Sequence, residues 1–228
     1  MWVLALSMFG MTFSNWMSVD GVILRFFCGG KIMRNKVFWI EGLPGTGKTT
    51  IISRLKARHK GLIVFPKTDV VSIFAKGLNF DFRAISKPSW DSAWAVEMLK
   101  CSILNGISST DDVVVVGERS YLSSLVYYAI CSHEHITDRF AVEGLKRKFK
   151  EIERHYDETV ILLEGDPKVC LGRDAESYSN FWHVREHAVG AGTLYREMAV
   201  EMGVKCHVVS AEDSLSHIMA EVEAIINA

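Results

Sequence analysis

The stretch KVFWIEGLPGTGKTT, residues 36–50, decides the fold of this protein. Its run VFWI, residues 37–40, is aromatic and β-branched, which suits a short buried strand. The following residues fit the pattern G-x-x-x-x-G-K-[ST], in which backbone N–H groups surround an anion, at Gly42, Gly47, Lys48 and Thr49. The sequence therefore predicts a phosphate-binding loop between a strand and a helix.

The side chains of this loop have separate predicted roles. Lys48 reaches the outer phosphates of a nucleotide, and Thr49 offers its hydroxyl to Mg²⁺. We expect a helix to begin near Lys48, with its positive end toward the phosphate and its buried side formed by Ile51, Ile52 and Leu55. The predicted nucleotide-contacting residues are Gly42, Leu43, Pro44, Gly45, Thr46, Gly47, Lys48, Thr49 and Thr50. An ordinary glycine-rich turn is the alternative interpretation.

Composition narrows the class of protein. The 228 residues include 26 basic and 27 acidic side chains, so charge gives no reason to expect a nucleic acid as the partner. Five scattered cysteines without a C-x-x-C pair indicate reduced thiols in a cytoplasmic protein. His133 and His135 have a spacing that suits a metal, but a solvated loop is the favoured interpretation because no further ligands accompany them.

The N-terminal segment, residues 1–32, differs from the rest of the chain. Residues 1–19 carry no charge, which is close to the shortest length that spans a membrane. The segment lacks the basic start of a signal peptide and the several arginines of a transit peptide. Because Met33 is a natural initiator, we expect residues 1–32 to be untranslated in the cell or dispensable, and a membrane anchor is the less favoured alternative.

Residues 33–228 contain no repeat, low-complexity tract or linker, and therefore predict one domain. Short apolar runs alternate in it with longer amphipathic ones, which predicts an α/β fold with a parallel sheet covered on both faces. The ligand of such a sheet binds at the carboxyl ends of the strands. The expected strands are Val37–Glu41, Leu62–Phe65, Val113–Val116, Thr159–Leu163 and Lys205–Val209.

A second group of charged residues follows the run of four valines at residues 113–116. These valines predict a strand buried on both faces, and Glu118 and Arg119 come directly after it. A carboxylate at this place holds Mg²⁺ or its water, and an arginine bridges phosphate oxygens as charge moves between donor and acceptor. A surface ion pair at the start of a helix is the alternative.

These motifs resemble those of thymidylate kinases and deoxynucleoside kinases, two related families of phosphate-loop kinases. The resemblance covers roughly residues 35–226 in order and spacing. It rests on the segments FWIEGLPGTGKTT, GERSYLSSLVYY, VILLEGDPKVCLGR, TLYREMA and VVSAEDSLSHIMAEVEAII.

The resemblance implies a three-layer P-loop kinase fold, with a five-stranded parallel sheet flanked by helices and a mobile lid. It further implies that ATP and Mg²⁺ bind at the phosphate loop, that Arg119 clamps the phosphates, and that Arg173 closes over ATP at the start of the lid. Phosphoryl transfer depends on positioning and on charge neutralisation, so these parts agree with its chemistry.

The acceptor side departs from the pattern of both families. Phe65 stands before Pro66 where those families have a glutamate, and Asp69 is the nearest substitute for that base. The helix expected at WDSAWAVEMLKCSIL has no arginine for an acceptor phosphate, and Lys100 is its only cation.

Three residues of the same helix are candidates for binding the acceptor. Trp90 and Trp94 stand four residues apart on one helix face, where an indole could stack on a nucleobase. Glu97 could then form a hydrogen bond with the edge of that base. Packing in the core is the favoured alternative for the two indoles.

The sequence thus predicts an ATP-dependent kinase that moves the γ-phosphoryl group to a small acceptor, a nucleoside or a nucleoside monophosphate. A kinase of a non-nucleotide small molecule and a catalytically silent nucleotide-binding protein are the alternatives. The sequence is compatible with a homodimer but does not decide the oligomeric state.

Overall fold

The structure is a computed structural model that describes residues 17–19, 22–24, 35–65, 90–107, 113–132, 136–173 and 185–228. Its centre is a five-stranded sheet in the order β4-β5-β3-β6-β7, and every neighbouring pair in this sheet is parallel. The strands are β3 (Asn35–Gly42), β4 (Ile63–Phe65), β5 (Val114–Glu118), β6 (Tyr156–Glu164) and β7 (Lys205–Ser210). All five predicted strands are confirmed, as is the parallel sheet.

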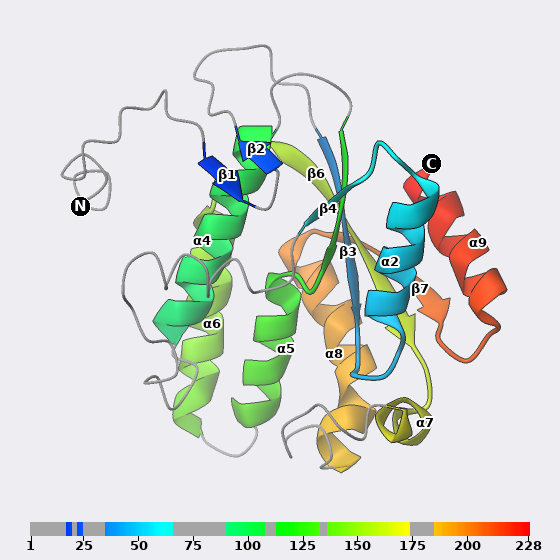
Figure 1. The fold of residues 1–228 in the computed structure, drawn as a ribbon. Coiled ribbons are helices and arrows are strands. Elements are labelled where there is room, and N and C mark those ends of the chain that lie inside the picture. Colours follow the sequence, from blue (N-terminus) through cyan, green and yellow to red (C-terminus); the bar gives the residue numbers. More distant parts are fainter. Residues whose placement is uncertain are drawn as a thin grey trace.

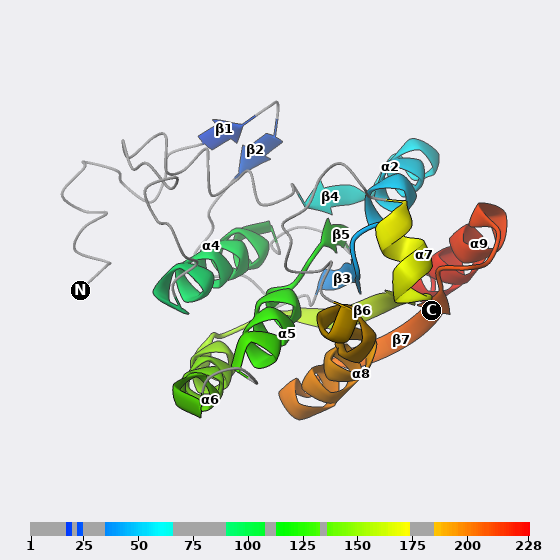
Figure 2. The same ribbon diagram turned by 90° about the horizontal axis from the view of Figure 1, so that it is seen from below.

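Helices cover both faces of this sheet (Figures 1 and 2), which makes three layers. One face carries α2 (Lys48–Arg58) and α9 (Leu215–Ile226). The other face carries α4 (Trp90–Ile107), α5 (Tyr121–Ser132), α6 (Ile136–Glu151) and α8 (Arg185–Met202). The short helix α7 (Pro167–Gly172) lies beyond the carboxyl end of β6.

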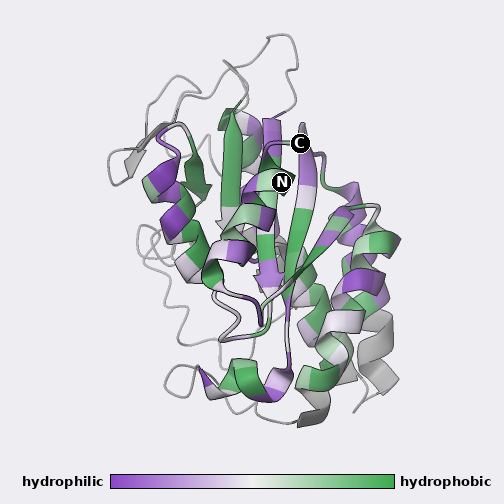
Figure 3. Ribbon diagram, turned by 90° about the vertical axis from the view of Figure 1, so that its right-hand side faces the viewer, coloured by the Kyte–Doolittle hydropathy of each residue, from purple (hydrophilic) through white to green (hydrophobic). Residues whose placement is uncertain are grey.

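The alternation of side chains along β3 divides the core into two parts. Val37 and Trp39 pack with the helices α4, α5, α6 and α8, whereas Phe38 and Ile40 pack with α2 and α9. All four side chains are buried, which is why the strand is apolar without interruption. Hydrophobic residues accordingly concentrate on the strands in Figure 3.

The connections of two neighbouring strands leave the sheet on opposite sides. β3 leads into α2 on one face, and its neighbour β5 leads into α5 on the other. Such a reversal opens a crevice at the carboxyl ends of the two strands, where open α/β sheets bind their ligands. Figure 2 looks onto this end of the sheet.

Of the N-terminal segment, the structure describes β1 (Met17–Val19) and β2 (Val22–Leu24), which form a separate antiparallel pair. Asp69, both histidines of the 133–135 stretch and lid residues 174–184 lie outside the described residues. Across the described ranges, no helix has both the length and the apolar character that crossing a bilayer requires.

Candidate functional site

The phosphate loop has the backbone that its glycines predict. Gly45 and Gly47 have φ angles of 74° and 91°, in the left-handed region that favours glycine. Gly42 also has a positive φ, of 135°, and a Cβ there would collide with the carbonyl oxygen of Leu163 on β6. Gly42 therefore lets the loop leave β3 tightly against the neighbouring strand.

Helix α2 begins at Lys48, as predicted, and buries Ile51, Ile52 and Leu55. Its N-cap is Gly47, and within the described chain no side chain caps this end and no acidic residue occupies the first turn. The N–H groups of the first turn and the positive end of the helix dipole are thus available to an anion.

The ammonium of Lys48 lies back over the loop. Its Nζ donates hydrogen bonds to the carbonyl oxygens of Gly42, at 2.9 Å, and Leu43, at 2.7 Å, and lies 3.4 Å from the hydroxyl of Thr46. The residue is only 5% exposed. The loop thereby places a positive charge beside the space that its N–H groups surround.

Thr49 and Glu118, the two predicted Mg²⁺ ligands, lie side by side. The Thr49 hydroxyl donates a hydrogen bond of 2.9 Å to the Glu118 carboxylate, whose side chain is 7% exposed. Hydroxyl and carboxylate oxygens are the hard ligands that Mg²⁺ binds, with phosphate and water completing its shell. The described residues include no group of three or more His, Cys, Asp or Glu that could hold a metal ion.

A cavity of about 640 Å³ joins these parts. Its volume lies within the usual range of small-molecule sites, about 300–1,000 Å³. Arg119 and Arg173 both contribute to its wall, and Arg173 also donates a hydrogen bond of 3.3 Å to the carbonyl of Ala211. The remaining wall comes from residues 44–51, from Glu118, and from Ala211, Asp213, Leu215 and Ile218.

The last four of these residues were not among the predicted site residues. They belong to the connection from β7 to α9 and to the first turns of α9. The rule that the carboxyl ends of parallel strands surround the ligand would have pointed to this connection, because it follows a predicted strand. The residue types of this connection do not by themselves indicate that it binds a nucleotide.

Arg119 has an unusual backbone for a long side chain. Its φ of 65° lies in the left-handed region, which costs an L-residue about 1–2 kcal/mol. Two hydrogen bonds hold this conformation: its N–H donates to the carbonyl of Ile40 at 3.2 Å, and its carbonyl accepts from Lys100 Nζ at 2.9 Å. The guanidinium Nε lies 4.0 Å from Glu118 Oε1.

Glu41 is a fully buried carboxylate next to the phosphate loop. It was not among the site residues predicted from the sequence. One oxygen accepts hydrogen bonds from the N–H and the hydroxyl of Ser120, at 2.6 and 2.7 Å, and the other accepts from the hydroxyl of Ser123 at 2.6 Å. The Ser123 hydroxyl also lies 3.0 Å from that of Tyr195 on α8. A charged residue within an apolar strand run is the signal that identifies it in the sequence.

The predicted acceptor residues are less completely described. Trp90 and Trp94 lie in α4, but their side chains fall outside the described part, as does Asp69. Glu97 is 2% exposed; its carboxylate lies 3.4 Å from Arg154 Nη2 and 4.0 Å from Lys100 Nζ. Its place is the core between α4 and the sheet, and it does not belong to the described wall of the 640 Å³ cavity.

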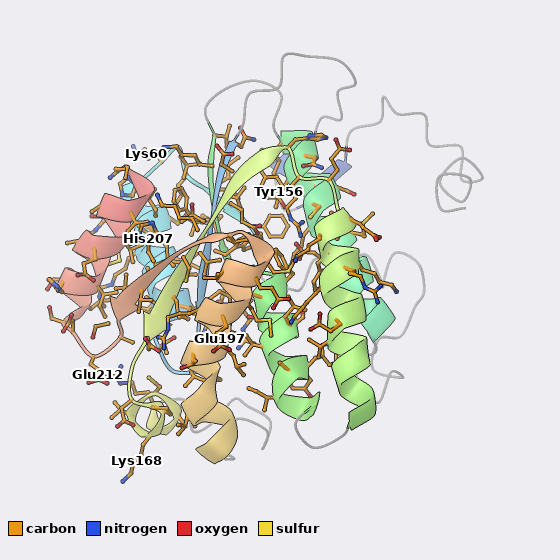
Figure 4. The ribbon with its side chains drawn as sticks, turned by 180° about the vertical axis from the view of Figure 1, so that it is seen from behind. Lys60, Tyr156, Lys168, Glu197, His207 and Glu212 are labelled. Carbon is orange, nitrogen blue, oxygen red and sulfur yellow. The ribbon has the colours of Figure 1, made fainter. Side chains whose placement is uncertain are left out.

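Glu97 belongs to a buried polar cluster between α4 and β6. Tyr156, at the start of β6 (Figure 4), lies with its hydroxyl 3.2 Å from Cys101 Sγ. Burial raises the pKa of Cys101 to about 12, so this thiol stays protonated. Burial, and next the charge of Glu97, raise the pKa of Glu158 to about 7. Arg154, whose Nε lies 3.8 Å from Glu158 Oε2, partly opposes that rise.

Comparisons with known proteins agree with this geometry. The sequence matches a family described as an AAA domain over residues 37–214, from β3 to the N-cap of α9. No curated protein sequence matches the chain.

Solved structures share the fold at low sequence identity. Deoxyadenosine kinase from M. mycoides with bound dATP is 14% identical, with a TM-score of 0.58 over 84% of this chain and 100% of that one. The same enzyme with bound dCTP has a TM-score of 0.57 at 14% identity, over 84% and 98% of the two chains. Thymidylate kinase from Candida albicans is 15% identical, with a TM-score of 0.56 over 85% and 92%.

These similarities confirm that the sheet and its helices form a P-loop kinase fold of the nucleoside and nucleotide kinase type. The family match covers most of the chain and includes the phosphate loop, Glu118, Arg119 and Arg173. The protein therefore belongs to the AAA domain family.

Proposed function

We propose that the protein is an ATP-dependent phosphotransferase that moves the γ-phosphoryl group of ATP to a nucleoside or a nucleoside monophosphate. The observation that carries the proposal is the convergence of Lys48, the Thr49–Glu118 pair, Arg119 and Arg173 on one cavity. These are the parts that phosphoryl transfer requires, because its catalysis consists of positioning and charge neutralisation.

Donor binding follows from the phosphate loop. The N–H groups of residues 45–49 and the positive end of α2 would bind the β- and γ-phosphates of ATP, and Lys48 would exchange its hydrogen bonds to loop carbonyls for bonds to phosphate oxygens. The nucleoside part of ATP would lie against the wall that Ala211, Asp213, Leu215 and Ile218 form.

Thr49 and Glu118 hold the metal side of the site. Their oxygens are the protein ligands for Mg²⁺, directly or through water. Mg²⁺, when bound, supplies positive charge to the β- and γ-phosphates.

The two arginines complete charge neutralisation. Arg119 lies beside Glu118 at the end of β5, where its guanidinium reaches both the γ-phosphate and the incoming acceptor. Arg173 follows α7 and lines the same cavity, from which it would reach the donor phosphates.

The acceptor class rests on similarity and on the residues of α4. The structural relatives are deoxyadenosine kinase, solved with dATP and dCTP, and thymidylate kinase. Trp90, Trp94 and Glu97 are the proposed acceptor-binding residues, and Asp69 is the proposed base for a nucleoside hydroxyl. A monophosphate acceptor needs no such base, because its phosphate is already ionised at neutral pH.

A cytoplasmic location is part of the proposal. Cys101, Cys170 and Cys206 are free thiols, as expected of a chain kept in a reducing compartment.

The test is ADP release from Mg²⁺–ATP by the full-length protein, with deoxynucleosides and nucleoside monophosphates as acceptors and with no acceptor as the control. We expect one acceptor to stimulate release strongly, and Lys48→Ala to abolish that stimulation. ATP binding without stimulation by any acceptor of either class would refute the proposal and favour a silent nucleotide-binding protein.

A further inference from the structure

Two charged side chains from other elements bond to the segment that carries the left-handed Arg119: Lys100 bonds to Arg119 itself, and Glu41 bonds to the next residue, Ser120. We propose that Lys100 on α4 and Glu41 on β3 are positioning residues, which act on phosphoryl transfer by aiming Arg119 into the phosphate cavity. This inference deepens the proposed function and rests on it.

Lys100 fixes the peptide plane that follows Arg119. Its Nζ donates a hydrogen bond of 2.9 Å to the carbonyl oxygen of Arg119. A left-handed residue persists in a folded protein only when its surroundings hold it there. The bond from Lys100 is a charge-assisted one, which makes it stronger than a bond between neutral groups.

Lys100 is itself fixed by the core. Its ammonium lies 5.3 Å from the centre of the Trp39 ring and 4.0 Å from Glu97 Oε2, and its side chain is 13% exposed. The position of the ammonium is thus set by buried groups of β3 and α4. The donor that faces Arg119 cannot move away without breaking these contacts.

Glu41 fixes the next residue along the chain. Its carboxylate accepts three hydrogen bonds from Ser120 and Ser123, including the one from the N–H of Ser120. The N–H of Arg119 itself donates to Ile40, the residue before Glu41. The segment that carries Arg119 is therefore tied to the strand that leads into the phosphate loop.

The geometry favours an indirect role for Lys100 over direct contact with a phosphate. Among the described residues, Arg119 belongs to the wall of the 640 Å³ cavity and Lys100 does not. Its Nζ already donates to the Arg119 carbonyl. Arg119 consequently carries the effect of Lys100 to the reacting groups.

A double-mutant cycle tests this role, because residues that act through one another give non-additive effects. The variants of the full-length protein are Lys100→Met, Arg119→Ala and the two combined. With Arg119 present, we expect Lys100→Met to lower kcat roughly tenfold or more while the acceptor KM changes less than about twofold. With Arg119→Ala, we expect Lys100→Met to change kcat less than about twofold.

Two results would overturn the inference. One is an equal loss of kcat from Lys100→Met in both backgrounds, which would show that Lys100 acts without Arg119. The other is a large rise of the acceptor KM that persists with Arg119→Ala, which would show that Lys100 binds the acceptor directly.

Lys146→Met is the matched control for the loss of a buried lysine. Lys146 is 8% exposed, and its Nζ lies 2.8 Å from both Glu143 and Glu201, so it joins α6 to α8. We expect this variant to lose stability without a change in kcat. Glu41→Gln is the second positioning variant, for which the same non-additivity with Arg119→Ala is expected.

The dissociation constant of Mg²⁺–ATP gives a readout that does not depend on transfer. In the protein that has Arg119, Lys100→Met should raise this dissociation constant roughly threefold or more. In the Arg119→Ala protein, Lys100→Met should leave it unchanged. If the unmodified protein transfers no phosphoryl group but this coupling is found, the proposed function fails, while Lys100 still positions Arg119 toward the bound ATP. If transfer occurs and both cycles are additive, the positioning role fails alone.

Discussion

The hydroxyl of Thr49 donates a hydrogen bond of 2.9 Å to the carboxylate of Glu118, although 69 positions separate the two residues in the chain. The sheet register explains the contact, because Glu118 on β5 pairs with Ile40 on β3. The loop that follows β3 returns at α2, whose first turn places Thr49 over the end of β5. Two short motifs far apart in sequence thereby bring the two proposed Mg²⁺ ligands together.

Thr49→Val should impair the use of Mg²⁺, because it removes one of the two protein oxygens while keeping the shape of the side chain. We expect the Mg²⁺ concentration for half-maximal activity to rise and activity at low Mg²⁺ to fall roughly tenfold or more. A Mg²⁺ titration of ADP release measures both. Ser53→Ala is the control, since the Ser53 hydroxyl bonds to the carbonyl of Thr49 within α2 and stands one turn away. An unchanged Mg²⁺ dependence in Thr49→Val would exclude Thr49 as a ligand.

Lys48→Ala should reduce the rate of phosphoryl transfer roughly 100-fold or more, because it removes the ammonium that would neutralise negative charge on the phosphates. The loop also loses the hydrogen bonds from Nζ to Gly42 and Leu43, so we expect unfolding free energy to fall by about 1 kcal/mol. Steady-state kinetics and thermal unfolding measure the two effects. Lys56→Ala, an exposed lysine of the same helix, is the control. A turnover number equal to that of the unmodified protein would overturn the assignment.

The donor side of the site could be predicted because its parts are local in sequence. A run of apolar residues, glycines at fixed spacing and the start of a helix specify the loop from residue 37 to residue 55, and the structure confirms each of them. Glu118 and Arg119 were predictable for the same reason, since they directly follow four valines. Parallel strands then bring the two local patterns to one edge of the sheet.

The features of the site that could not be predicted from the sequence depend on contacts between residues far apart in the chain. The carbonyl of the left-handed Arg119 accepts a hydrogen bond from Lys100, and Glu41 bonds to the following Ser120, although neither partner is adjacent to this segment in the chain. The sequence predicts that Glu97 binds the edge of a base, yet its buried carboxylate lies 3.4 Å from Arg154, 57 residues away. Side-chain partners of this kind follow from the packing of α4 against the sheet, which periodicity does not specify.

A chain that begins at Met33 should keep the fold and the activity. In the described part of the protein, the buried core begins at Asn35 and Val37. Loss of β1 and β2 removes an antiparallel pair outside the five-stranded sheet, so we expect the unfolding temperature to change by less than about 4 °C. Thermal unfolding of the two chain lengths measures this. Loss of cooperative unfolding in the shorter chain would show that residues 1–32 belong to the domain.

Glu158 is a buried carboxylate that shares Arg154 with Glu97, and we expect its burial to make the stability of the protein depend on pH. Arg154 Nη2 lies 3.4 Å from Glu97 and its Nε lies 3.8 Å from Glu158. Lys100 faces the same cluster from α4, 4.0 Å from Glu97. Because burial and the Glu97 charge raise the pKa of Glu158 to about 7, Glu158 binds a proton more tightly in the folded than in the unfolded chain.

Glu158→Gln should therefore remove a pH dependence of stability. Where the folded chain holds more protons than the unfolded chain, from about pH 4.5 to 7, the unfolding free energy falls as pH rises. Between about pH 5 and 8 we expect the unmodified protein to lose roughly 2 kcal/mol relative to Glu158→Gln, because the amide is neutral at every pH. Denaturant unfolding at several pH values measures the difference, with Glu151→Gln, an exposed change at the end of α6, as the control. Parallel stability curves for the unmodified protein and Glu158→Gln would show that Glu158 does not titrate in this range.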